Sequence, residues 1–172
     1  MTVARIKDPV REVLGEARRW LGVREEPRGS NRGVAIDFFN YQSLPDWRDY
    51  PMGVKGAPWC AAFVSTVGQL ALGHAWPVQR SVSCQVIADW ADSKGVLHRH
   101  PQRPAGGDLF LLYYQSLGRF GHTGLVVGAD GDAIMTLEGN TNLGGTREGY
   151  GVFERVRQVG ETTAFVRWVD AL

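Results

Sequence analysis

The sequence predicts an α+β fold, with helices in the first half of the chain and antiparallel strands in the second. Apolar side chains recur at helical spacing in residues 9–22, and residues 60–72 form a long run without a charged side chain. After Gly95 the pattern changes to short runs of β-branched and aromatic residues separated by turn residues. Helices followed by strands are typical of helices packed on an antiparallel sheet, and they argue against a doubly wound α/β fold.

Local signals predict where the helices lie. The expected helices are residues 9–22, 34–42, 60–72 and 84–93. Gly22 stops the first helix, and Pro58 suits the start of the third, which is apolar nearly all round and therefore expected to be buried. Ser81 or Ser83 is a suitable cap for the fourth helix. The Pro- and Gly-rich residues 43–58 are predicted to form an irregular approach to the third helix.

The strand pattern predicts that a histidine and a carboxylate meet. The expected strands are residues 108–115, 122–128, 133–138, 152–159 and 163–169. A three-residue hairpin loop at 129–131 places glycine at its last position, and it pairs Gly128 with Asp132. On that register His122 lies opposite Glu138, on one face of the sheet, with Cβ atoms about 5 Å apart. A slip of one residue would put the two side chains on opposite faces.

Cys60 stands at the start of the third predicted helix. Free backbone N–H groups and the positive end of the helix dipole lower the pKa of a thiol in that position. A thiol, an imidazole and a carboxylate that orients the imidazole form the general pattern of nucleophilic catalysis. Cys60, His122 and Glu138 therefore predict a cysteine nucleophile, its base and the orienting group.

Other interpretations of these residues remain open. A free cysteine is most often a small buried apolar residue, which is how we interpret Cys84. A single disulfide between Cys60 and Cys84 also fits the sequence. A metal site formed by His122, Glu138 and Asp108 is a weaker alternative, because no second histidine lies at ligand spacing.

Composition limits the classes of partner. The 172 residues suit one domain, and apolar and charged fractions of 44% and 22% are those of an ordinary globular protein. The net charge of +1, with scattered arginines, gives no basic field for nucleic acid. The longest apolar stretch, residues 61–72, is too short to cross a membrane and contains polar residues. We expect a monomer that binds neither nucleic acid nor membrane.

Four motifs together resemble a known family. GAPWCAAFVS, GGDLFLL, FGHTGLVVG and LEGNTN are similar to the corresponding segments of CHAP-type cysteine amidohydrolase/peptidase domains. These domains are papain-like and related to the NlpC-type cell-wall peptidases. The resemblance covers most of residues 57–169, and VREEPRGSNRG resembles the segment before the cysteine in bacterial and phage relatives. It implies one domain over residues 1–172, with the helical segment 9–42 as part of it.

The resemblance also implies a reaction and its residues. Cys60 would be the nucleophile, His122 the general base and acid, and Glu138 the residue that orients the histidine. Asn140 matches an asparagine that assists the histidine or the substrate in such sites. The substrate would be a peptide or sugar–peptide amide of bacterial peptidoglycan, with no metal and no cofactor.

Three further residues are candidates for substrate binding. Trp59 either lines the substrate groove or packs against the helix that follows it. Asn31 lies in the family-like loop before the cysteine. Asn142 begins the loop-like stretch after Asn140, which either binds substrate or connects two strands.

The N-terminal stretch bears on where the protein acts. It is charged throughout and lacks the apolar segment of a signal peptide. We therefore expect a protein that is cytoplasmic at synthesis and reaches the wall after phage lysis or by non-classical export.

Overall fold

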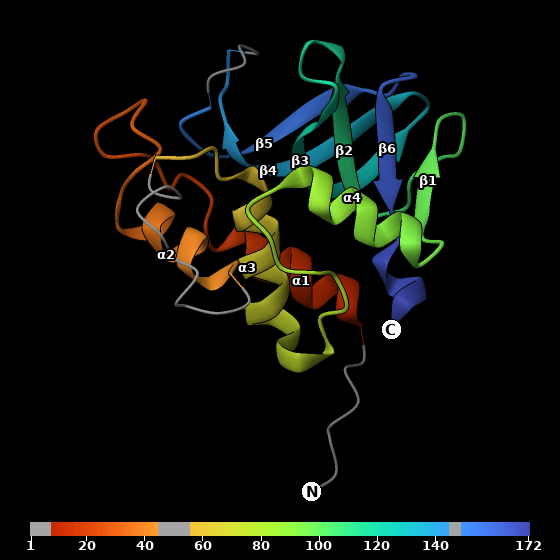
Figure 1. The fold of residues 1–172 in the computed structure, drawn as a ribbon, viewed down its shortest axis with the longest axis horizontal. Helices are drawn as coiled ribbons and strands as arrows, with labels where there is room; N and C mark the ends of the chain where they lie inside the picture. Colours follow the sequence, from red (N-terminus) through yellow and green to blue (C-terminus); the bar gives the residue numbers. More distant parts are fainter. Residues whose placement is uncertain (1–7, 45–55, 145–148) are drawn as a thin grey trace, which may run out of the picture.

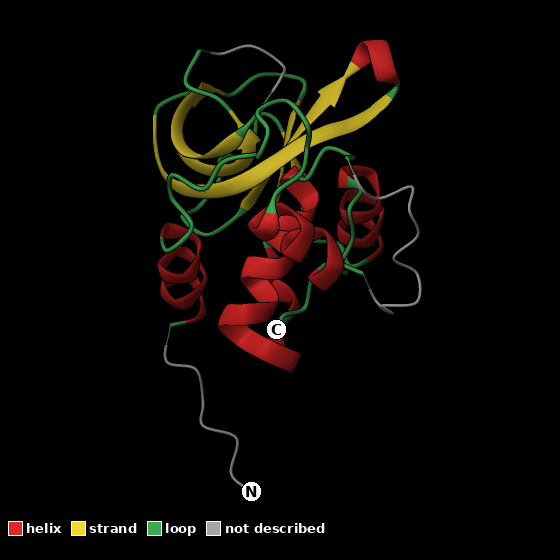
Figure 2. Cartoon of the chain, turned by 90° about the vertical axis from the view of Figure 1, so that its left-hand side faces the viewer, coloured by secondary structure: helices red, strands yellow, loops and turns green. Residues whose placement is uncertain are grey.

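A layer of helices packs against one face of a curved antiparallel sheet (Figures 1 and 2). The structure is a computed structural model that describes residues 8–44, 56–144 and 149–172. Its helices are α1 (Pro9–Arg18), α2 (Val34–Gln42), α3 (Cys60–Leu72) and α4 (Cys84–Ser93), with the short 3-10 helix η3 (Gly73–Ala75) after α3. Most of the irregular segment predicted at residues 43–58, before the third helix, lies outside the described residues. The predicted α+β fold class is confirmed.

The helices begin where the sequence predicts, but the first ends early. The side chain of Asp8 caps α1 by accepting a hydrogen bond from the Arg11 N–H, at 3.0 Å. The helix was expected to reach Gly22 and stops at Arg18. The reason is a competing partner, because the Gly22 N–H donates to the Val152 carbonyl at 3.0 Å. The chain after α1 is thereby tied to the edge of the sheet.

The described residues form one six-stranded sheet. Its strands are β1 (Leu97–Arg99), β2 (Leu109–Tyr114), β3 (Arg119–Asp130), β4 (Ala133–Thr141), β5 (Gly151–Gln158) and β6 (Thr163–Val166). Their order across the sheet is β1-β6-β2-β3-β4-β5, and every neighbouring pair is antiparallel. The sequence did not predict β1, a strand of three residues of which two are basic.

The last strand is shorter than the predicted range 163–169, because its final residues are not part of the sheet. β6 ends at Val166, and Trp168–Ala171 forms the short 3-10 helix η5. The indole N–H of Trp168 donates to the Gly107 carbonyl at 2.6 Å, and the ring is fully buried. This contact turns the chain out of the sheet and under the helical side.

Successive apolar residues of the strands point alternately to the two faces of the sheet, and they belong to two apolar clusters. Leu109, Leu111, Leu125 and Leu137 belong to the main core shared with the helices. The residues between them point to the other face, where Phe110, Val126, Ile134 and Phe165 form a second cluster. Helix α3 is central to the main core, since it contacts α1, α2, β3 and β4. A buried helix start is thus fixed against the strand that carries His122.

The hairpin between β3 and β4 differs from the predicted one. Asp130 pairs with Ala133, so the turn has two residues and Gly131 occupies its first position, at φ +57°. Such turns favour glycine there. A bulge follows between Val126 and Gly128, and beyond it Leu125 pairs with Leu137. In this register the residue opposite Glu138 is Gly124, whereas the predicted register placed His122 there. The expected register is therefore wrong, but by an even number of residues.

Beyond the bulge the register differs from the predicted one by two residues, so His122 and Glu138 still point to the same face. His122 lies diagonally from Glu138, within reach of long side chains on the same face of an antiparallel pair. The two residues do form a hydrogen bond, His122 Nε2 to Glu138 Oε2, at 2.8 Å. The predicted contact is confirmed, although the pairing that predicted it is not.

Gly124 makes room for the Glu138 side chain. A Cβ atom added there would lie 2.8 Å from Glu138 Cγ and 2.9 Å from the Leu137 carbonyl oxygen. We expect Gly124→Ala to lower the free energy of unfolding by about 1–3 kcal/mol, because backbone and a buried carboxylate must shift. Gly128→Ala, on the same strand, is the matched control, since its Cβ would meet only Met135 Cε at an ordinary 3.5 Å. Denaturant unfolding of both variants measures the effect, and equal stability would contradict it.

Candidate active site

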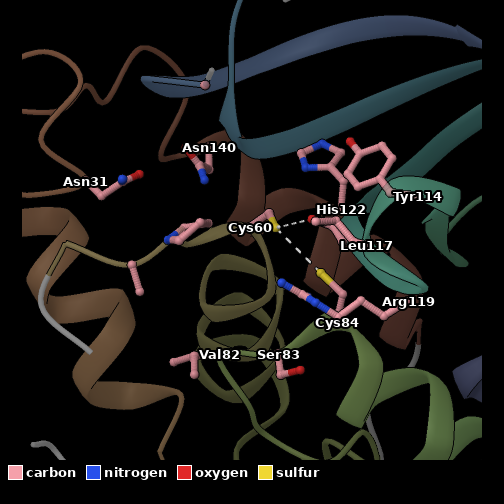
Figure 3. Close-up of a pocket in the computed structure, with 14 residues that line it drawn as sticks. Asn31, Cys60, Val82, Ser83, Cys84, Tyr114, Leu117, Arg119, His122 and Asn140 are labelled. Atoms are coloured by element: carbon pink, nitrogen blue, oxygen red, sulfur yellow. Dashed lines mark hydrogen bonds between the residues drawn. The ribbon is translucent and has the colours of Figure 1, made fainter. Parts of the chain in front are cut away.

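Cys60 is the first residue of α3 and lines a pocket of about 390 Å³ (Figure 3). The N-cap residue Trp59 makes no side-chain capping hydrogen bond, so the first N–H groups of the helix have no such partner. Cys60 is 2% exposed overall, and its sulfur lies 4.0 Å from the Gly121 carbonyl oxygen on β3. The thiol is therefore held at a helix N-terminus beside the strand that carries His122.

Glu138 holds His122 from the far side. The Glu138 carboxylate is completely buried and accepts hydrogen bonds from His122 Nε2 at 2.8 Å and from Thr136 Oγ1 at 2.5 Å. The Arg157 guanidinium on β5 binds it through two bonds of 2.5 Å, from Nε and Nη2. Because Nε2 is engaged with Glu138, Nδ1 is the ring nitrogen left for Cys60. The sequence analysis did not predict a role for Arg157, because its partner Glu138 lies on another strand, 19 residues away in the chain.

The electrostatics favour a thiolate–imidazolium pair. A hydrogen bond from Cys84, opposed by burial and supported by the hydrogen bond and charge of His122, holds the pKa of Cys60 well below its ordinary value. Burial pulls the pKa of His122 down, but Cys60 and Glu138 outweigh burial and raise it to about 9. Burial also opposes ionisation of Glu138, yet hydrogen bonds from Arg157 and His122 keep its pKa well below the ordinary range. The negative charges of Cys60 and Glu138 and the positive charges of His122 and Arg157 therefore stabilise one another.

Cys84 is a buried residue of the main core, as the sequence suggested, and it also lies next to Cys60. It is the first residue of α4, it lines the same pocket, and its sulfur lies 3.6 Å from that of Cys60. Both cysteines are free thiols. The hydrogen bond to Cys60 and burial raise the pKa of Cys84, so the shared proton stays on Cys84. A signal for this position existed, because the predicted cap Ser83 already placed Cys84 at a helix start.

Two asparagines contribute to the pocket wall. Asn140 and Asn31 both line the pocket, and both have positive φ, +52° and +53°. The Asn140 amide can bridge the Trp59 N–H (3.1 Å) and the Gly149 carbonyl (3.3 Å), with its oxygen toward the former and its nitrogen toward the latter. Asn140 thereby ties the end of β4 to the start of α3. The unusual backbone of these residues is typical of functional sites.

A buried carboxylate connects the Asn31 loop to α3. Glu25 is 4% exposed, and its two oxygens accept from Trp59 Nε1 at 2.9 Å and from the Gly29 N–H at 2.7 Å. Trp59 is 0% exposed and stacks on Phe39, with ring centroids 5.7 Å apart. Its side chain therefore packs in the core, which is the second of the two alternatives that the sequence left open for Trp59. Its role is to anchor the residue before Cys60.

The third candidate for substrate binding, Asn142, follows the last residue of β4. It is 5% exposed, it is not among the residues that line the pocket, and its carbonyl accepts a hydrogen bond from Arg155 Nη1. These contacts give Asn142 a structural position at the end of β4. Part of the predicted loop 140–151, namely 145–148, lies outside the described residues.

The metal alternative finds no support in the described part of the chain. Asp108 accepts from the Ala105 N–H at 2.8 Å and pairs with Arg167 at 3.1 Å, so it closes a turn before β2. Across residues 8–44, 56–144 and 149–172, no group of three His, Cys, Asp or Glu side chains is placed to hold a metal ion. Over the same ranges, each helix is too short or too polar to span a bilayer.

Comparison with protein families decides the family. The model of the CHAP domain matches residues 51–140, which are 90 of the 172 residues and include Cys60, His122, Glu138 and Asn140. The chain belongs to the CHAP family. CHAP domains are typically peptidoglycan hydrolases, so membership suggests a peptidoglycan amidase or peptidase activity in general. A search of curated proteins gives no significant match.

A solved structure supports the fold of this CHAP domain. The chain is similar to the structure reported as "The crystal structure of Ly7917", with a TM-score of 0.50 and 17% sequence identity. The match covers 91% of this chain and 62% of that chain, so this chain spans less than two thirds of the length of Ly7917. At this identity the likeness concerns the papain-like fold alone.

Proposed function

We propose that this CHAP domain hydrolyses an amide bond of bacterial peptidoglycan through a thioacyl-enzyme formed on Cys60. The observation that carries the proposal is that Cys60, at the start of α3, lines the same pocket as His122 and interacts with it, while Glu138 lies 2.8 Å from Nε2 of the imidazole. Family membership supports peptidoglycan as the polymer. The bond is either in the stem or crossbridge peptide or between sugar and peptide.

The reaction follows from the charges of the free site. The Cys60 thiolate attacks the amide carbonyl, and the carbonyl electron pair moves onto oxygen. The Cys60 N–H lies in the first turn of α3, where a backbone N–H has no partner within the helix, and it is one donor for this oxyanion. Asn31, across the pocket, is the candidate for the second donor, because its loop is fixed by Glu25.

His122 moves the protons. As imidazolium it protonates the leaving amine, so that the C–N bond breaks and a thioester remains on Cys60. The neutral imidazole then takes a proton from water, which attacks the thioester and releases the carboxylate. Glu138 keeps Nε2 engaged throughout, so Nδ1 exchanges the protons.

Digestion of purified peptidoglycan tests the proposal. We expect the protein to release new free amino groups together with soluble fragments, and mass spectrometry of the fragments identifies the hydrolysed bond. Acyl transfer would instead give products with a new amide, and a wall-binding module would sediment with the polymer without releasing fragments. Absence of hydrolysis from peptidoglycans of several crossbridge types would overturn the proposal.

A further inference from the structure

The pocket contains a second thiol that the proposed hydrolysis does not use. Cys60 and Cys84 are the first residues of α3 and α4, so two helix N-termini converge on two sulfurs 3.6 Å apart (Figure 3). Both residues line the pocket, which gives a small solute access to them, although each is at most 4% exposed. A disulfide bond is about 2.05 Å long, so bonding requires an approach of about 1.5 Å.

We propose that Cys84 is a resolving thiol, which captures a peroxide-oxidised Cys60 as a reversible intramolecular disulfide. This makes the pair a modification site within the candidate active site. The loss of activity on oxidation rests on the proposed function, whereas the disulfide itself does not. The supporting observations are the 3.6 Å between the sulfurs, the pocket that both residues line, and the position of each thiol at a helix start.

The first step uses the Cys60 thiolate. Its sulfur attacks one oxygen of a hydroperoxide, the O–O bond breaks, and hydroxide or alkoxide leaves, so that Cys60 becomes a sulfenic acid. Thiolate character is what selects a cysteine for this reaction, and the charge of His122 and the hydrogen bond from Cys84 both stabilise the thiolate. Cys84, whose pKa is raised, stays protonated and is not the site of attack.

The second step reverses the role of Cys84. Once Cys60 is a neutral sulfenic acid, the hydrogen bond to its thiolate and the thiolate charge no longer raise the pKa of Cys84, although burial still does. Arg119, which lines the pocket, and the N-terminus of α4 then favour the Cys84 thiolate. Its sulfur attacks the Cys60 sulfur, the S–O bond breaks, and water leaves with the proton of Cys84. Two thiols have then given two electrons to one peroxide.

Intact-mass measurement tests the proposal without a substrate. The purified protein is treated with hydrogen peroxide, and we expect a mass lower by about 2 Da, a Cys60–Cys84 linked peptide after proteolysis, and full return to the reduced mass with a thiol reductant. Cys84→Ser keeps the size of the side chain but cannot form the disulfide. In this variant we expect Cys60 to accumulate about 32 and 48 Da of added oxygen, which the reductant does not remove.

Cys60→Ser is the matched control, in which no disulfide within the molecule can form under the same treatment. Addition of oxygen to wild-type Cys60 at the rate seen in Cys84→Ser would overturn the proposal, and so would disulfides between molecules in place of the intramolecular one. A peptidoglycan assay before and after reduction keeps the two proposals apart. A reversible disulfide in a protein that never hydrolyses peptidoglycan would overturn the proposed function and leave the resolving role intact.

Discussion

Cys60→Ala is expected to lower the rate of peptidoglycan hydrolysis by about 10⁴-fold or more, because no other group can form the thioester. Cys84 cannot replace it, because His122 is among the groups that act on the Cys60 thiol but not among those that act on Cys84, so Cys84 lacks the base. The substitution removes a single sulfur atom at a pocket wall, so we expect the fold to persist. The assay is release of free amino groups from purified cell wall.

Unfolding measurements provide the control for Cys60→Ala. Circular dichroism and the midpoint of thermal unfolding should stay close to those of the wild type. Hydrolysis by a well-folded Cys60→Ala protein at more than a few per cent of the wild-type rate would contradict the nucleophile assignment. Thiol alkylation gives an independent measure, because Cys60 should react at a pH well below the ordinary thiol range.

Glu138→Gln is expected to lower kcat/KM by about 10²–10⁴-fold and to move the alkaline limb of its pH profile to lower pH. In the wild type His122 keeps its proton up to a pKa of about 9, so activity should fall as pH rises through that value. Removing the carboxylate removes a charge that raises this pKa, and the charge of Arg157 is left behind. Both effects favour the neutral imidazole, so its proton is lost earlier as pH rises.

A second Glu→Gln variant, which removes the same charge from an exposed side chain, shows whether the shift of the alkaline limb depends on the position of Glu138. Glu154 lies on β5, its side chain is 57% exposed, and it pairs with Arg18 at 3.8 Å. Glu154→Gln should leave the pH profile unchanged. Glu138→Gln should also lower the free energy of unfolding by about 1–3 kcal/mol, because buried hydrogen bonds to a charge are lost. An alkaline limb that stays in place in Glu138→Gln would contradict the role of the carboxylate.

Local sequence patterns were sufficient to predict where the helices begin and that His122 and Glu138 lie on the same face of the sheet. Cys60 and Cys84 begin helices because proline, serine and apolar spacing mark the ends within a few residues. The histidine–carboxylate contact needed the side-chain alternation of the strands, which survives an even error in register. The register error arose from the length of the turn together with the bulge between Val126 and Gly128, and the bulge has no local signal.

The remaining parts of the site depend on contacts between distant segments. Glu25 meets Trp59, and Arg157 meets Glu138, only after α1, α3 and the sheet have packed together. Nothing in the sequence near Cys84 states that α4 will bring it to 3.6 Å from Cys60. Such pairs follow from tertiary packing, which single-sequence patterns do not encode.

The distribution of these long-range contacts sets a limit on modular reuse of the domain. The family-matched segment 51–140 contains Cys60, His122 and Glu138, yet the groups that hold Trp59 and the carboxylate in place lie on either side of it. A protein engineer who transplanted that segment alone would also discard β6, the strand between β1 and β2. A transplanted catalytic segment therefore has to include residues on both sides of 51–140, among them Glu25 and Arg157.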